Sequence, residues 1–116
     1  MRVFTTIVAL AVVAGCGGSY PKPTERLAAS EGALRGAQEI GAPAHPQAAL
    51  YLKMAQEEIN RARDLMGKDE NREADYMLQR ARADAELAIA IARAARAQAE
   101  LQRLEQGTRP GQGGMP

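Results

Sequence analysis

Cys16 is the one residue in this 116-residue sequence whose type and setting point directly to chemistry. It is the only cysteine, and a thiolate is a strong nucleophile that can be alkylated to a thioether. The apolar Val13 and the small Ala14 and Gly15 come immediately before it. This setting makes Cys16 the candidate site of a covalent modification.

The segment ahead of Cys16 has the organisation of a cleaved export signal. Met1 and Arg2 form a positive start, and residues 3–13 form an apolar run of about eleven residues. That run is well short of the ~20 residues that a transmembrane helix needs. We therefore predict a signal peptide over residues 1–15.

The four residues Val13-Ala14-Gly15-Cys16 resemble the lipobox of bacterial lipoproteins. The resemblance implies that the chain is cut between Gly15 and Cys16, where the small side chains of Ala14 and Gly15 suit a narrow peptidase site. It also implies a thioether-linked diacylglycerol and an N-acyl chain on Cys16, and we predict no other cofactor. Lipoproteins with an aspartate after the lipidated cysteine tend to stay in the inner membrane, whereas Gly17 follows Cys16 here. The resemblance thus favours the periplasmic face of the outer membrane.

The remaining candidate groups predict neither catalysis nor metal binding. His45 is the only histidine and lies between prolines in a predicted loop, where we expect it to be solvated. With Cys16 modified, no nucleophile and base are paired and no ligands cluster, and we expect the adjacent Glu57 and Glu58 only to solubilise a helix. We predict that the protein is not an enzyme.

The charge balance argues against a nucleic-acid partner. The sequence has 15 lysines and arginines and 14 acidic residues, and cleavage would remove Arg2 to leave 14 of each. Nucleic-acid binding depends on a basic face that displaces counterions from phosphates. The membrane, reached through the lipid, is the partner that the sequence predicts most directly.

Composition and periodicity predict an all-α protein. Alanine dominates, Trp is absent, and the single Phe lies in the predicted signal, so high helix propensity must compensate for a thin core. We expect an alanine-rich antiparallel hairpin within a three-helix arrangement that has a long C-terminal helix. The predicted parts are a flexible tether over residues 16–23, helices over residues 24–40, 46–66 and 70–106, and a disordered tail over residues 107–116.

Residues at the ends of these segments suggest how each helix starts and stops. Thr24 can cap the first helix, Pro46 suits the start of the second, and Asp69 or Asn71 can cap the third. Gly67 suits the left-handed position after a helix. Gly32 and Gly36 either allow close helix contact or simply loosen the first helix.

The third predicted helix carries an alanine seam along one side and charges along the other. The seam comprises Ala74, Leu78, Ala81, Ala85, Ala88, Ala92, Ala95 and Ala99, widened on one side by Met77, Leu87 and Ile91. The charged face comprises Asp75, Arg82, Glu86, Arg93, Arg96 and Glu100. Because acids share this face with the arginines, we interpret it as solvated.

The third predicted helix is longer than its neighbours can cover. At 1.5 Å per residue it is about 55 Å long and the second helix about 31 Å, which leaves an overhang of roughly 24 Å. Short loops place the first helix parallel to the third, so the overhang points away from the tether. We expect its apolar residues to be either exposed on a rod or buried in an envelope protein or another copy; they are Ile91, Ala94, Ala95, Leu101 and Leu104.

A lipobox followed by an alanine-rich hairpin, with Gly41-Ala42-Pro43, Gly67 and Ala83-Asp84-Ala85-Glu86-Leu87-Ala88, resembles the domain-of-unknown-function 4398 family of envelope lipoproteins. The resemblance covers roughly residues 27–98 and implies no catalytic residues. Residues 68–73 depart from the shorter turn of that family. The expected function is a lipid-anchored helical spacer or adaptor. The alternative is a non-covalent tether to the peptidoglycan cell wall.

Overall fold

The computed structural model describes residues 18–108, which form three α-helices and one short 3₁₀ turn and contain no strand. The helices are α1 (Thr24–Glu39), α2 (Pro46–Gly67) and α3 (Asn71–Thr108), and the turn η1 covers Ala42–Ala44. This confirms the predicted all-α class and the long C-terminal helix. The predicted signal peptide, Cys16 and residues 109–116 lie outside the described part of the chain.

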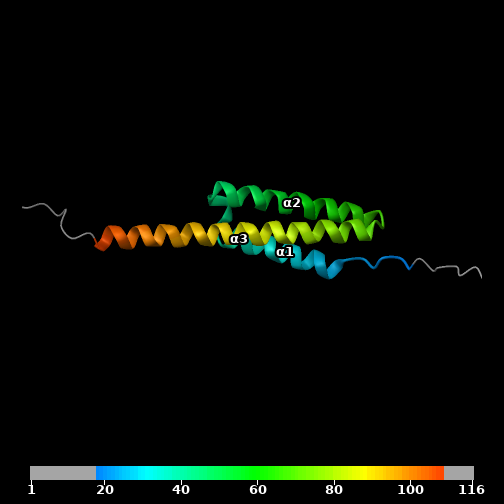
Figure 1. The fold of residues 1–116 in the computed structure, drawn as a ribbon. Coiled ribbons are helices and arrows are strands. Elements are labelled where there is room, and N and C mark those ends of the chain that lie inside the picture. The colour runs from blue at the N-terminus through cyan, green and yellow to red at the C-terminus, as the bar shows by residue number, and fades with distance from the viewer. Residues whose placement is uncertain (1–17, 109–116) are drawn as a thin grey trace, which may run out of the picture.

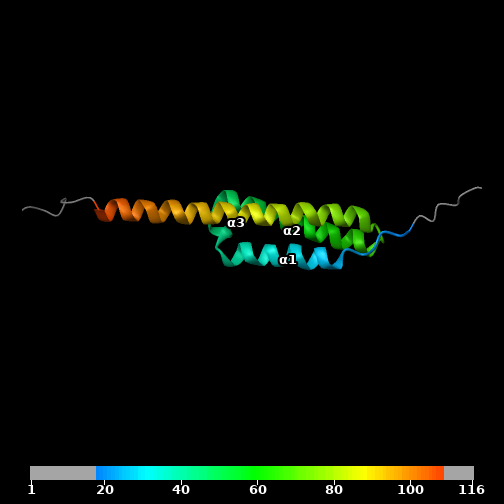
Figure 2. The ribbon, with the colours of Figure 1, turned by 60° about the horizontal axis from the view of Figure 1, so that its bottom comes forward.

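The helices form an elongated bundle that is three helices thick at one end and a single helix at the other (Figure 1). α2 and α3 run antiparallel as a hairpin, and α1 packs beside α3 and parallel to it (Figure 2). The chain enters α1 at the same end of the bundle as the turn between α2 and α3. α3 then continues alone past the end of its neighbours, as its length predicted.

The turn between α2 and α3 differs from the prediction in which residue adopts the left-handed conformation. Gly67 is the last residue of α2, and Asp69 has a φ of 59°. The amide of Asp69 bonds to Met66 O (3.3 Å) and that of Glu70 to Leu65 O (3.0 Å), the paired bonds of a Schellman motif. Aspartate tolerates this conformation better than most side chains, so the left-handed position lies two residues later than predicted and the helix ends one residue later.

Both ends of α1 also differ from simple capping rules. Thr24 is the first helical residue, and the preceding Pro23 provides no side-chain hydrogen bond, so the prediction that Thr24 caps α1 is wrong. At the other end Gly41 has a φ of 87° and its amide bonds to Gln38 O. An added Cβ at Gly32 would meet nothing within 4 Å, and at Gly36 only Ile89 at 3.6 Å. The two glycines therefore do not mediate a close helix crossing.

The core is a seam of alanines with a few larger side chains. Ile59 of α2 and Leu78 of α3 are the largest apolar side chains that are fully buried. The seam of α3 is buried as predicted from Ala74 to Ala92, but Ala95 is half-buried and Ala99 is exposed. Leu87, predicted to widen the seam, is 41% exposed. The bundle core thus ends at Ala92, and α3 continues beyond it.

The C-terminal end of α3 lies further along the chain than predicted. Gly107 and Thr108 remain helical, and the Thr108 hydroxyl donates to Leu104 O at 2.8 Å. The predicted disordered tail is therefore wrong for these two residues. Within residues 18–108, no helix combines the length and the apolar character needed to cross a membrane.

Candidate functional site

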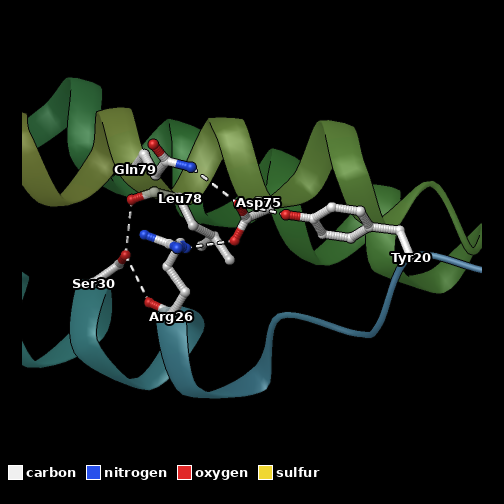
Figure 3. Close-up of polar contacts among 6 residues, drawn as sticks. All are labelled: Tyr20, Arg26, Ser30, Asp75, Leu78 and Gln79. Carbon is white, nitrogen blue, oxygen red and sulfur yellow. Dashed lines mark hydrogen bonds and ion pairs between the residues drawn. The ribbon is translucent and has the colours of Figure 1, made fainter.

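The described part of the chain concentrates its buried polar contacts where the N-terminal segment meets α3. Four side chains meet there, and we call them the Asp75 cluster: Tyr20, Arg26, Asp75 and Gln79 (Figure 3). The Tyr20 hydroxyl and the Gln79 amide each donate to Asp75 Oδ2 at 3.0 Å, and Arg26 Nε forms an ion pair with Asp75 Oδ1. One carboxylate thus joins the entering segment, α1 and α3.

Asp75 is buried, which the sequence did not predict, and its burial has the largest consequence for the site. The helical periodicity placed it on the solvated face, but it is only 6% exposed. Its neighbours Tyr20 and Arg26 are 55 and 49 residues away in sequence, so no local pattern could indicate the pairing. The only sequence signal was an acid at a position that α1 could cover.

Ser30 provides a second polar link between α1 and α3. Its hydroxyl is fully buried and lies 2.8 Å from Arg26 O, one turn back in α1, and 2.9 Å from Leu78 O in α3 (Figure 3). The hydroxyl has one hydrogen, which is shared between the two carbonyl oxygens, and the serine side chain itself is small. Ser30 therefore lets α1 approach the backbone of α3 where a larger side chain would separate them.

Tyr20 is also held to α3 through its backbone carbonyl and its aromatic ring. The Asn71 amide donates to Tyr20 O at 3.2 Å, and the Arg72 guanidinium lies 5.8 Å from the centre of the Tyr20 ring, within the range of a cation–π interaction. The predicted flexible tether therefore does not extend to Tyr20. Tyr20 is the fourth residue after Cys16, which allows a reach of at most about 14 Å.

The surroundings of Asp75 favour its charged form. Burial alone would disfavour the carboxylate, but the hydrogen bonds from Tyr20, Gln79 and Arg26 outweigh burial and hold the pKa of Asp75 below its usual value. The same hydrogen bond raises the pKa of the Tyr20 hydroxyl, because that hydroxyl must keep its proton to donate. The cluster is therefore built around an ionised aspartate.

Acid should weaken this cluster. Because the pKa of Asp75 is lower in the folded than in the unfolded chain, its contribution is present above the unfolded value of about 3.9 and is lost as pH falls below it. We expect Asp75→Asn to lower the free energy of unfolding at neutral pH by about 1 kcal/mol and to reduce the loss of stability below pH about 4. Denaturant unfolding across pH measures both effects, and Asp64→Asn, at an exposed position, is the control. If Asp75→Asn lost as much stability in acid as the unmodified protein does, Asp75 would not be the group responsible.

Glu58 is a second buried acid, but its surroundings disfavour its charged form, whereas those of Asp75 favour it. It lies 9% exposed between α2 and α3, and its Oε2 has no hydrogen-bond partner among the described residues. Arg80 Nη2 approaches Oε1 at 3.1 Å but is itself largely exposed. Burial and the nearby charge of Asp84 raise the pKa of Glu58, despite Arg80. The expectation that Glu58 merely solubilises α2 is therefore wrong, whereas Glu57 is exposed as expected.

Removing the charge of Glu58 should stabilise the fold. A pKa raised on folding means that ionised Glu58 opposes folding above that pKa, and that the penalty is relieved as pH falls through it towards the unfolded value of about 4.3. We expect Glu58→Gln to raise the free energy of unfolding at neutral pH by up to about 1 kcal/mol. Thermal unfolding of Glu58→Gln beside Glu57→Gln measures this, and a clear loss of stability specific to Glu58→Gln would show that the Arg80 pair dominates.

An open surface hollow of about 570 Å³ lies beside the Asp75 cluster. Lys22, Arg26 and Arg82 contribute positive charges to its lining, while Glu25 and Asp75 contribute negative ones. His45 lies at the opposite end of α1, half-buried at the start of α2. Among residues 18–108, no three histidine, cysteine or acidic side chains are grouped so that they could hold a metal ion.

The predicted partner surface divides into two parts. Ile91 packs against the core cluster of Ala37, Ala42, Ala48, Ala88 and Ala92, so the prediction that it lacks a partner within the chain is wrong. Ala95 is half-buried on the extension of the seam. Ala94, Leu101 and Leu104 are exposed, and the two leucines are 58% and 61% exposed. The lipobox residues Val13, Ala14, Gly15 and Cys16 lie outside the described residues.

The sequence matches the family model described as a domain of unknown function, DUF4398, over residues 25–104. The chain belongs to the DUF4398 family. The match runs from the first turn of α1 into the last turns of α3, so the DUF4398 region comprises all three helices together with most of the overhang. No curated protein and no solved structure matches the chain.

Proposed function

We propose that this DUF4398 protein is a non-enzymatic lipoprotein of the bacterial envelope, anchored through Cys16 and acting as a helical spacer or adaptor. The observation that carries this proposal is the attachment of Tyr20 to α3 by Asp75 and Asn71. Tyr20 is the fourth residue after the proposed lipid site, so the three-helix end of the bundle lies within about 14 Å of Cys16. The free end of α3 then lies at the end of the bundle opposite the anchor.

The shape of the described bundle supports a mechanical rather than a catalytic role. From Arg93 to Thr108 α3 extends beyond its neighbours as a single helix for about 24 Å. The alanines of this overhang favour helix without needing a core. Such a helix can present a surface at a set distance from the anchored end of the chain, and this is what a spacer or adaptor requires.

Replacement of Cys16 tests the anchor directly. We expect Cys16→Ser to abolish incorporation of labelled palmitate and to prevent cleavage before residue 16, because the thiol is the acceptor of the lipid. Mass spectrometry of the exported wild-type protein should find a lipidated N-terminal cysteine. Anchoring by acyl chains is strong, at about 0.8 kcal/mol per buried CH₂.

The control is Ser19→Ala, which alters the segment after the lipobox without touching the thiol. It should be lipidated and fractionate with membranes like the wild type. An unmodified Cys16 in the exported protein, with residues 1–15 still attached, would overturn the proposed anchor.

A further inference from the structure

α3 carries a second apolar stripe on the side opposite the buried seam. Its members follow alternating steps of four and three residues and are all exposed; they are Ala83, Leu87, Ala90, Ala94, Ala97, Leu101, Leu104 and Thr108. We call them the outer stripe. Its leucines are 41%, 58% and 61% exposed in chain order. Within residues 18–108, neither α1 nor α2 covers the outer stripe, and their apolar contacts with this part of α3 are made on its other side, through Ala85, Ala88 and Ala92.

The spacing of the outer stripe is that of a coiled-coil seam. Apolar residues that repeat in steps of four and three keep one face of a helix directed at a partner helix. The stripe covers residues 83–108, or about 38 Å of helix. It begins on the bundle and continues to the end of the overhang, so a partner helix could follow it without displacing α1 or α2.

The charges beside the outer stripe indicate what kind of helix fits it. Arg93 and Glu100 flank it on the same side, one heptad apart. If a second α3 lies antiparallel with Ala94 of one copy opposite Ala97 of the other, then Leu87 meets Leu104 and Leu101 meets Ala90. In this register Arg93 of each copy lies about 3 Å along the axis from Glu100 of the other. Two-fold symmetry forms the pair twice.

Other arrangements place like charges together. A parallel pair brings Glu100 of one copy towards Glu105 of the other and leaves Arg93 beside Gln98. Shifting the antiparallel helices by one heptad opposes Arg93 to Arg93 or Glu100 to Glu100. The favoured register has one unfavourable pair, Asp84 with Glu105, at each outer end. The flanking charges thus select one orientation and one register.

We propose that two copies of this chain associate through the outer stripe as an antiparallel pair of α3 helices. The pair is centred between Ala94 and Ala97, which allow the two backbones to approach closely, and leucines close the outer layers. The starts of the two α3 helices then lie about 74 Å apart, at opposite ends of the dimer. This goes beyond the proposed function and does not depend on lipidation of Cys16.

Engineered disulfides test the orientation. The full-length chain is purified in detergent with Cys16→Ser in every variant, so that introduced thiols are the only ones. We expect a mixture of Leu87→Cys and Leu104→Cys proteins to form a disulfide dimer of one chain of each kind. Neither variant should crosslink with itself, because residue 87 of one copy lies about 25 Å from residue 87 of the other along the axis. Self-crosslinking of Leu87→Cys, or no crosslink in the mixture, overturns the proposal.

Association measured by analytical ultracentrifugation tests the surface itself. In the same Cys16→Ser background we expect Leu101→Lys to raise the dimer dissociation constant more than about tenfold, because it places a charge in the apolar layer that Leu101 forms with Ala90 of the other copy. Gln106→Lys adds the same charge on the opposite side of the overhang and should leave the constant unchanged. Equal effects of the two variants, or a monomeric parent protein, contradict the proposal.

Exchange of the flanking charges gives a third readout. Arg93→Glu alone should weaken association, and adding Glu100→Arg should restore it, because the ion pairs re-form with reversed signs. Both positions are exposed, so helical circular dichroism should stay at the parent level and exclude unfolding as the cause. Failure of the double variant to recover would exclude this register. Because all these proteins lack the thiol at position 16, the result is separate from the lipidation experiment.

Discussion

Leu78→Ala should lower the free energy of unfolding by about 2–5 kcal/mol, a large part of the ~5–15 kcal/mol that stabilises a typical domain. Leu78 is fully buried, and most of its neighbours along the seam of α3 are alanines. In a core with so few large side chains, small neighbours cannot move in to fill the space left by a leucine. Most of the transfer and cavity cost should therefore remain.

Denaturant unfolding followed by helical circular dichroism measures the effect of Leu78→Ala. The Ser30 hydroxyl bonds to the backbone carbonyl of residue 78, so this link between α1 and α3 is kept in the variant. Leu50→Ala is the matched control, because Leu50 is also helical but 56% exposed. A loss below about 1 kcal/mol for Leu78→Ala would mean that this part of the core relaxes far more than its burial indicates.

Ala85→Leu should destabilise the bundle by about 1–3 kcal/mol or more, for the opposite reason. Ala85 is fully buried in the same cluster as Ala55 and Ile59 of α2. Its methyl group fills the space between the helices, so three further carbon atoms must push α2 and α3 apart. Neighbouring alanines along the seam would then also lose contact, so the loss of stability would extend beyond residue 85 itself.

The measurement is the same unfolding experiment, and Ala28→Leu is the control. Ala28 is exposed on α1, where leucine is almost as good a helix former as alanine, so the control should change stability by less than about 0.5 kcal/mol. If Ala85→Leu proved as stable as the control, the close packing of α2 against α3 would be wrong.

Helix positions followed closely from local sequence. Gly41 and the segment from Gly67 to Asn71 interrupt the periodicity, and the structure starts and ends its helices within two residues of the predicted bounds. The buried seam from Ala74 to Ala92 was also predictable, because a step of three or four residues places side chains on one face of any α-helix. Only the details of the caps at Thr24 and Asp69 required backbone geometry.

The buried polar groups did not follow from local sequence. Helical periodicity assigns a residue to a face but does not say which faces other segments will cover. α1 and Tyr20 cover the face that carries Asp75, α3 covers Glu58, and the end of the bundle covers Ile91. Each of these contacts joins residues that are far apart in sequence, so only the tertiary arrangement could reveal them.

The sequence by itself determined that this protein is helical, where its helices break, that one side of its last helix is a core seam, and that Cys16 has the setting of a lipid attachment site. These are properties of composition and short spacing, which depend on neighbours within a few turns. The tertiary structure decided that an ionised Asp75 holds the N-terminal segment and that α3 leaves a second stripe uncovered. Both depend on which surfaces meet when three helices of unequal length pack together, and no single helix carries that information.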